Sequence, residues 1–473
     1  MKHLQNAITV LIICFVLLTG LPAVSFAISI PDEKKLADKF MKMIQEERGI
    51  LDDPAASHLI NTVGRHILIR LPPQPFTYTF YLVDDDTFNA FASPGANIFI
   101  HRGLITALSS TDELAGILAH EIAHAASRHV SESIDRSKIV GIGSMAGVLA
   151  GVLIGSAGGG DAAQALTVGS MAAGQSAMLA FTRENETEAD QKAFSMLKQT
   201  AYSPEGLLDS LNILRAADFR GIEGIPDYFK THPGTGNRIA HLAALLSTYL
   251  PPEQPISAPD TYDYNMVKYR LMGLYEDTGK SIQKIETQLA NDISESHRKA
   301  CHYGLGLLSA RENRRDKAIL HLQKALSFDL LDPLVLVELG RVYTIDGQYE
   351  KALDLLLGIQ SDPILGTMAR YHLARTQLAL GDLLSARKNL NQVTAISPRA
   401  FPRAYFHLAN IMSRENKTAL SHYYLGLYYE MIKDWKNAAR HLTKALDEGL
   451  EDTDIKNAAQ ERLKGISKDK PSS

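Results

Sequence analysis

Two histidines stand four positions apart in the stretch LAHEIAHAASRH, residues 118–129. If this stretch is helical, His120 and His124 lie on one face, because side chains at i and i+4 sit one above the other. Their imidazole nitrogens could then hold one metal ion at zinc-ligand distances. Glu121 is rotated about 100° around the helix from His120, from where it could reach a metal-bound water. The spacing therefore predicts two metal ligands and a general base for hydrolysis of a peptide bond.

The residues before this stretch carry the signals of a helix start. Ser110 is followed three positions later by Glu113, which is the pattern of a capping box. Leu114, Ile117 and Leu118 then form an apolar stripe at helical spacing. A helix that is merely buried would show the same stripe, so the two histidines alone leave that alternative open.

A metal site of this kind needs a third protein ligand. The stretch FTRENETEAD, residues 181–190, contains Glu184, Glu186, Glu188 and Asp190 near the predicted start of a second helix. The simpler interpretation is an acidic first turn that is solvated and stabilised by the helix dipole. From the residues alone, none of these carboxylates is singled out as the ligand.

These two stretches together resemble the zinc metallopeptidases related to HtpX and the CAAX prenyl proteases. HEIAH is followed by Arg128 and His129, and then by TRENETEAD. The resemblance implies that Glu186 is the third ligand of one Zn²⁺ per chain. It also implies that Asp190 holds a ligand histidine through its second ring nitrogen, and that Arg183 lies near the site.

The stretch FNAFASPGANIFIHRGLI, residues 88–105, also resembles this family. The resemblance implies that Asn97, Ile98, Phe99 and Ile100 form an edge strand that pairs with an extended substrate. An ordinary hairpin strand is the alternative.

The stretch THPGTGNRI, residues 231–239, matches another family motif and implies that His232 lies near the metal. His232 could stabilise the oxyanion of the tetrahedral intermediate, or it could fill the open metal position and hold the enzyme inactive. A lone His-Pro in a loop usually does neither. His101 and His129 are not expected to be ligands. His129 lies about 140° around the helix from His124, so it is expected to pack beneath the site.

The first 27 residues resemble a secretory signal peptide. A basic start precedes an apolar run and the small-residue site Ser25-Phe26-Ala27, which predicts cleavage after Ala27 and a periplasmic location. An uncleaved membrane anchor is the alternative. Cleavage would leave Cys301 as the single cysteine, so no disulfide within the chain is expected.

Residues 139–181 are rich in Gly, Ala and Ser, and no charge occurs between Ile139 and Gly160. Such a run is long enough to span a bilayer. The small residues favour instead two closely packed helices on the catalytic core, which could also touch a membrane surface.

The rest of the chain predicts a mainly α protein with a small β-sheet. Four prolines interrupt the pattern after residue 250 and indicate a linker. Beyond it, Ala318, Ala352 and Ala386 recur at intervals of 34 residues, the period of the tetratricopeptide repeat. A later copy is out of phase, which predicts an extra or irregular helix near residues 400–415. The predicted division is 1–27 signal peptide, 28–250 zincin-like peptidase domain, 251–261 linker, 262–465 α-solenoid of repeats and 466–473 polar tail.

This order of parts resembles periplasmic quality-control peptidases of Gram-negative bacteria. It implies a zinc endopeptidase that degrades misfolded or misassembled outer-membrane proteins, with repeats that recruit substrate or the β-barrel assembly machinery. A formal net charge of −4 gives no electrostatic basis for nucleic-acid binding. Two alternatives stay open, a chaperone or adaptor with latent protease activity, and an integral membrane metallopeptidase.

Overall fold

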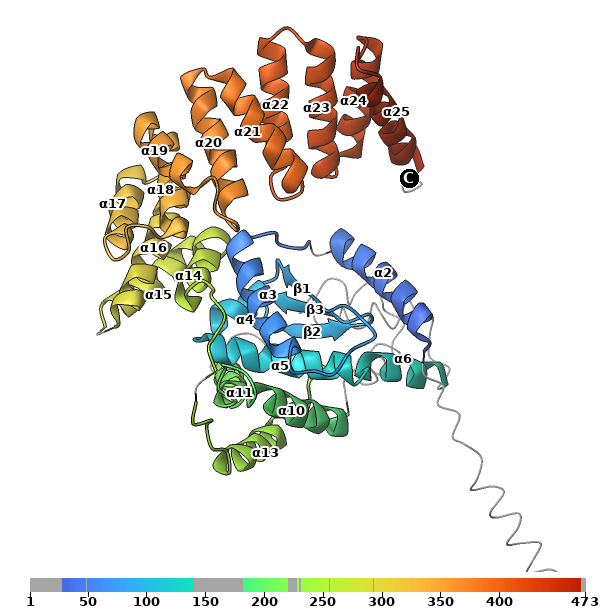
Figure 1. Ribbon diagram of the computed structural model, residues 1–473, viewed down its shortest axis with the longest axis vertical. Helices are drawn as coiled ribbons and strands as arrows, with labels where there is room; N and C mark the ends of the chain where they lie inside the picture. The colour runs from blue at the N-terminus through green and yellow to red at the C-terminus, as the bar shows by residue number, and fades with distance from the viewer. Residues whose placement is uncertain are drawn as a thin grey trace, which may run out of the picture.

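The computed structural model describes residues 28–47, 49–139, 182–219, 228, 231–254, 256–291 and 293–468. An N-terminal α/β unit lies beneath an arch of paired helices (Figure 1). The prediction of a mainly α fold with a small sheet and a helical solenoid is confirmed. The elements of the first unit are α2 (Ile30–Glu47), α3 (Pro54–Leu68), β1 (Thr79–Val83), β2 (Ala90–Ser93), β3 (Asn97–His101), α4 (Arg102–Ala107), α5 (Thr111–Ala126), α6 (His129–Ile139), α10 (Arg183–Leu197), α11 (Glu205–Phe219) and α13 (Thr235–Ser247).

The three strands form one sheet in the order β1-β3-β2, with β1 parallel and β2 antiparallel to β3. Successive side chains alternate between the faces, as strand geometry requires. Leu82 and Ile98 join the core beneath α3 and α5, whereas Phe91 and Phe99 face α2 and contact its Phe40. The sheet is therefore buried on both faces.

This topology corrects one expectation about the substrate-binding edge. Asn97, Ile98, Phe99 and Ile100 belong to β3, which is the central strand and not an edge. Their main-chain groups are already paired with β1 on one side and β2 on the other, so they cannot pair with a substrate. The strand order depends on the crossover between β1 and β3, which short apolar runs do not specify.

Helix α5 runs through the middle of the N-terminal unit and contacts α3, α10, α11 and the sheet. Ser110 caps it by accepting a hydrogen bond from the main-chain N–H of Glu113. A Cβ atom built on Gly116 would lie 2.6 Å from Cα of Leu207 in α11, so only glycine permits this approach. The position of α5 is thus defined by packing on all sides.

The second unit is built from antiparallel helix pairs. Its elements are α14 (Tyr264–Tyr275), α15 (Thr278–Leu289), α16 (Glu295–Arg311), α17 (Arg315–Leu326), α18 (Pro333–Asp346), α19 (Tyr349–Ile359), α20 (Gly366–Leu380), α21 (Leu383–Ile396), α22 (Arg403–Arg414), α23 (Thr418–Met431), α24 (Trp435–Asp447) and α25 (Thr453–Lys468). Gly306, Gly340 and Gly426 face Leu322, Leu356 and Leu442 of the partner helices at distances that leave no room for a Cβ. Helix α22 falls where the out-of-phase copy predicts an extra helix.

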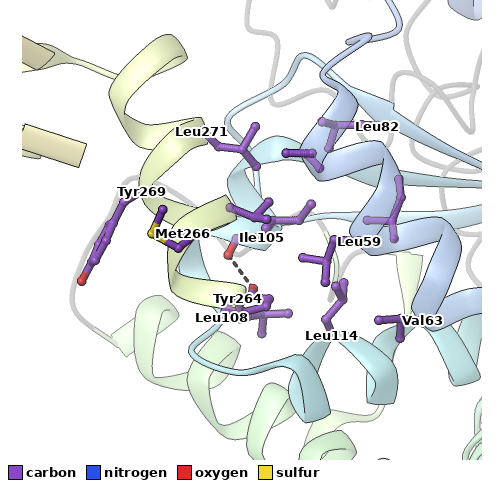
Figure 2. Close-up of a cluster of buried hydrophobic side chains, with 14 of the residues drawn as sticks. Leu59, Val63, Leu82, Ile105, Leu108, Leu114, Tyr264, Met266, Tyr269 and Leu271 are labelled. Atoms are coloured by element: carbon purple, nitrogen blue, oxygen red, sulfur yellow. Dashed lines mark hydrogen bonds between the residues drawn. The ribbon is translucent and has the colours of Figure 1, made fainter. Parts of the chain in front are cut away.

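Helix α14 joins the two units (Figure 2). The hydroxyl of Tyr264 donates a 2.7 Å hydrogen bond to the carbonyl of Ile105 in α4. Met266 and Leu271 extend the same apolar core, which runs without a break from α3 into the helix pairs. The linker before α14 contains no helix or strand among its described residues.

Three predicted features fall outside the described residues. They are the signal peptide at 1–27, nearly all of the segment 139–181, and the end of the polar tail. Within the described ranges, no helix is both long and apolar enough to cross a bilayer.

Candidate metal centre

Helix α5 presents His120, Glu121 and His124, and none of the three is exposed to solvent. The Nε2 atoms of the two histidines lie 3.0 Å apart. Two imidazoles at i and i+4 meet here as their spacing predicts. Glu121 leaves the helix on a neighbouring side and is equally buried.

Helix α10 supplies two buried carboxylates, Glu186 and Asp190, which are one helical turn apart. Thr182 caps the helix by accepting from the main-chain N–H of Asn185. Glu186 Oε1 lies 3.3 Å from His124 Nε2, and its Oε2 lies 3.4 Å from His120 Nε2. The structure thus brings together the three residues that the sequence and its resemblance suggest as ligands.

His232 joins the same cluster from the segment before α13. Its Nδ1 lies 3.1 Å from Glu186 Oε1 and 3.3 Å from His120 Nε2. The ring stacks on Tyr228 with centroids 4.5 Å apart, and both side chains are fully buried. The other ring nitrogen, Nε2, lies 3.4 Å from Glu121 Oε1. His232 therefore sits between the other donor atoms and the carboxylate of Glu121.

The four donors His120, His124, Glu186 and His232 have ligand atoms that all lie within 4.8 Å of one another. A tetrahedral zinc ion with ligands at about 2.0–2.1 Å would separate its donor atoms by roughly 3.3 Å. The separations given above lie between 3.0 and 3.4 Å. Imidazole nitrogens with a carboxylate are a donor set that suits zinc. The residues fit a zinc ion.

Asp190 anchors the ring of His120 from behind. Its Oδ1 lies 2.8 Å from His120 Nδ1, which leaves Nε2 to face the cluster. Arg238 of α13 reaches Asp190 with Nε and Nη2, both at 2.8 Å, and reaches Glu186 with Nη1 at 2.8 Å. Burial raises the pKa of both carboxyls, but the guanidinium of Arg238 and neighbouring imidazoles hold each pKa below its ordinary value.

The sequence interpretation missed Arg238, although it lies in the stretch THPGTGNRI that identified His232. Arg183, the arginine expected near the site, is exposed at the first turn of α10 and, among the described residues, forms no ion pair with the cluster. No local pattern distinguishes the two arginines. Only the packing of α13 against α10 decides which one compensates the buried carboxylates.

The two other histidines occupy supporting positions. His129 Nδ1 lies 2.9 Å from His124 Nδ1, on the side of that ring away from the donor cluster. His101 contacts Thr87 at 2.8 Å and lies outside the cluster.

Glu121 lies between the donor cluster and strand β2. Burial raises the pKa of its carboxyl, while His232, His120 and, least of these, the main-chain N–H of Ala92 act in the opposite direction. Ala92 pairs with Ile98, and the N–H of His101 donates to the carbonyl of Asn89. Hydrogen-bonded pairs alternate along this ladder from Asn89, which leaves Ala92 in a non-hydrogen-bonded pair. The main-chain groups of Ala92 consequently face away from β3 and toward the site. The sheet edge beside Glu121 is β2.

Tyr228 and His232 are fixed at the same edge. The main-chain N–H of Tyr228 donates to the carbonyl of Phe88, just before β2, at 3.1 Å, and His232 N–H donates to the carbonyl of Tyr228 at 2.8 Å. These two bonds hold the imidazole against the cluster. The arrangement combines a closed set of metal donors with a buried carboxylate and a nearby strand edge.

Comparisons with known proteins agree with this geometry. Residues 59–246 match the profile of Peptidase family M48. Two relatives are named beta-barrel assembly-enhancing protease, and each aligns with 67% of this chain. The one from Yersinia pestis is 26% identical and the one from Escherichia coli K12 is 25% identical. The chain spans 63% and 62% of the length of these two relatives. The mitochondrial metalloendopeptidase OMA1 of Schizosaccharomyces pombe is 25% identical over 45% of this chain and 60% of its own length.

Proposed function

We propose that this chain, whose residues 59–246 match the profile of Peptidase family M48, is a zinc-dependent endopeptidase. The observation that carries the proposal is the convergence of His120, His124 and Glu186 beside the buried carboxylate of Glu121. The named relatives are proteases or endopeptidases, which supports the same reaction class.

The side chains of His120, His124 and Glu186 would hold the zinc ion, with Asp190 and Arg238 orienting them. A bound zinc ion would supply Lewis acidity to the scissile carbonyl and to the attacking water. Glu121 is the general base. Its buried carboxylate accepts a proton from the attacking water and then delivers it to the leaving amine.

Strand β2 supplies the docking edge for the substrate. An extended chain that pairs with Ala90 and Ala92 would pass beside Glu121, because the main-chain groups of these residues face away from β3. Pairing through the main chain gives affinity with little sequence preference. Unfolded or misassembled proteins are therefore the proposed substrates.

His232 holds the site in a resting state. Of the two roles open to it, the geometry favours that of a fourth donor, because its Nδ1 stands at ligand-like distances from Glu186 and His120. Catalytic zinc sites keep one position for water or substrate, and structural sites do not. Tyr228, on whose ring the imidazole of His232 stacks, also lies beside the start of β2. Tyr228 and His232 must move before a substrate can enter.

The closed donor set favours one second candidate function. The chain could act chiefly as a chaperone or adaptor, with proteolysis released only when His232 moves. We place either activity in the periplasm on the strength of the signal-like residues 1–27. Outer-membrane proteins and their assembly machinery are the proposed substrate and partner, by analogy with the names of the relatives. Contact of residues 139–181 with a membrane surface remains part of this proposal.

The decisive experiment measures bound zinc and proteolysis of an unfolded test protein in parallel. Glu121→Gln should retain about one zinc per chain and lose at least about a hundredfold in cleavage rate. Glu186→Gln should lose zinc as well as cleavage. Glu188→Gln is the matched control, because it makes the same change on the same helix at a half-exposed side chain outside the cluster.

The outcomes separate the candidates. Cleavage by Glu121→Gln at the unmodified rate would refute its role as the base. Absence of zinc from the unmodified protein would refute the ligand set. If Glu121→Gln suppresses aggregation of an outer-membrane protein as well as the unmodified chain does, the chaperone function is the main one.

A further inference from the structure

A pocket of about 350 Å³ opens on the helical array, away from the metal centre. Helices α18, α20 and α22 form its walls; α18 and α20 are the first helices of successive pairs, and α22 is the extra helix that follows them. Thr344, Arg375 and Arg414 contribute to the lining, one from each helix. None of the described residues that line this pocket is acidic.

The positive charge in and around the pocket has no compensating carboxylate. Within the described ranges, Arg375, Arg403 and Arg414 form no ion pair, whereas Arg341 and Arg387 are paired with Glu338 and Glu415. The guanidinium carbon of Arg375 lies 5.9 Å from the centroid of the Tyr371 ring. Arg414 is exposed and projects from the last turn of α22.

Arg375 is half-buried and lies within electrostatic reach of two other arginines. Burial, followed by repulsion from Arg341 and Arg403, lowers the pKa of its guanidinium despite an opposing effect of Tyr371. His407, which also lines the pocket, has its pKa lowered to about 4 by burial and by Arg375 and Arg403. A partly desolvated cation without a counter-charge is unfavourable, and an anion bound in the pocket would relieve it.

The walls of the pocket are partly apolar. Phe406 lines it and is 46% exposed, and Leu378 and Ala379 lie opposite on α20. Asn410 adds an amide that can donate to or accept from a main chain. A bare phosphate would leave the apolar walls uncovered, whereas a peptide would use both surfaces.

We propose that this pocket binds a carboxylate side chain of an extended protein segment, with a neighbouring apolar residue of the same segment against Phe406. Arg375 and Arg414 clamp the carboxylate from two helices, and Asn410 pairs with the adjacent main chain. This proposal names the class of ligand that the helical array would recruit. The proposal rests on the recruiting role proposed for the array and does not depend on the peptidase chemistry.

The test is isothermal titration calorimetry on the full chain carrying Glu121→Gln, which prevents cleavage of the titrant. The probes are a short amidated peptide with Asp-Phe-Glu at its centre and the same peptide with Asn-Phe-Gln. The acidic peptide should bind at least about tenfold more tightly, as expected for a charge-assisted hydrogen bond. Arg375→Gln and Arg414→Glu should each weaken it by about tenfold or more.

Lys388→Glu on α21 is the matched control for Arg414→Glu, because both reverse an exposed charge and Lys388 does not line the pocket. Arg414 is exposed and forms no ion pair with the described residues, so its variant tests binding even if Arg375→Gln unfolds. Equal affinity for the two peptides, or equal effects of Arg414→Glu and Lys388→Glu, would overturn the proposal. Displacement of the peptide by inorganic phosphate at equal concentration would also overturn it, in favour of a phosphate site. Loss of proteolysis is a separate readout and would not change these results.

Discussion

Replacement of Arg270 by methionine should destabilise the whole chain, because this one side chain connects the two units. Arg270 projects from α14 and is 3% exposed. Its Nε lies 2.8 Å from Asp53 of the N-terminal unit, and its Nη1 lies 2.8 Å from Glu338 of the array. The same Nη1 donates to the hydroxyl of Tyr303 at 2.9 Å.

The Arg270→Met variant leaves two buried carboxylates without their common cation. Breaking a buried pair in this way costs about 3–5 kcal/mol. With a urea m-value at the upper end of about 1–3 kcal/mol per molar, the unfolding midpoint should fall by roughly 1 M or more. Arg387→Met, which breaks a partly exposed pair with Glu415, should cost no more than about 1 kcal/mol.

Urea unfolding followed by circular dichroism and by Trp435, the only tryptophan of the chain, measures this effect. A triple variant with Arg270→Met, Asp53→Asn and Glu338→Gln should recover most of the loss, since no buried carboxylate is left charged without a cation. Arg341, which loses its partner Glu338, still reaches solvent. Asparagine also keeps the cap that Asp53 provides to α3. The reasoning is refuted if the triple variant is no more stable than the single one, or if Arg270→Met behaves like Arg387→Met.

Three further predictions concern pH, packing and the resting state. Burial would raise the pKa of the Glu338 carboxyl, but neighbouring guanidinium groups lower it to about 2 from 4.5. The ionised carboxylate therefore contributes its full stabilisation above pH 4.5 and loses it as pH falls toward 2. The destabilisation caused by Glu338→Gln, measured by urea titration, should shrink over the same pH range. Gly116→Ala should destabilise the fold by about 1–3 kcal/mol, because the new Cβ meets the backbone of α11; Gly236→Ala, where nothing lies within 4 Å, is the control, and equal unfolding midpoints would contradict the packing argument. His232→Ala should keep zinc and cleave an unfolded protein faster than the unmodified chain, whereas a rate as low as that of Glu121→Gln would show that the imidazole is catalytic.

Local patterns predicted the features that depend on short stretches of chain. The i, i+4 spacing of His120 and His124 places both rings on one face of any helix that forms there. The interval of 34 residues in the array is the length of one helix pair with its turns. The interruption of that interval in the sequence indicated the extra helix α22. Sequence similarity added Glu186, Asp190 and His232, which no spacing rule could have selected from the other acidic residues and histidines.

The tertiary structure alone decided how distant segments meet. It made β3 the central strand, so that β2 and not the stretch Asn97–Ile100 borders Glu121. It brought Arg238 rather than Arg183 onto the buried carboxylates. It also placed α14 against α4 so that Arg270 could join the two units. Each of these contacts joins residues far apart in the sequence, and its energy depends on burial and charge compensation that exist only after the chain has folded.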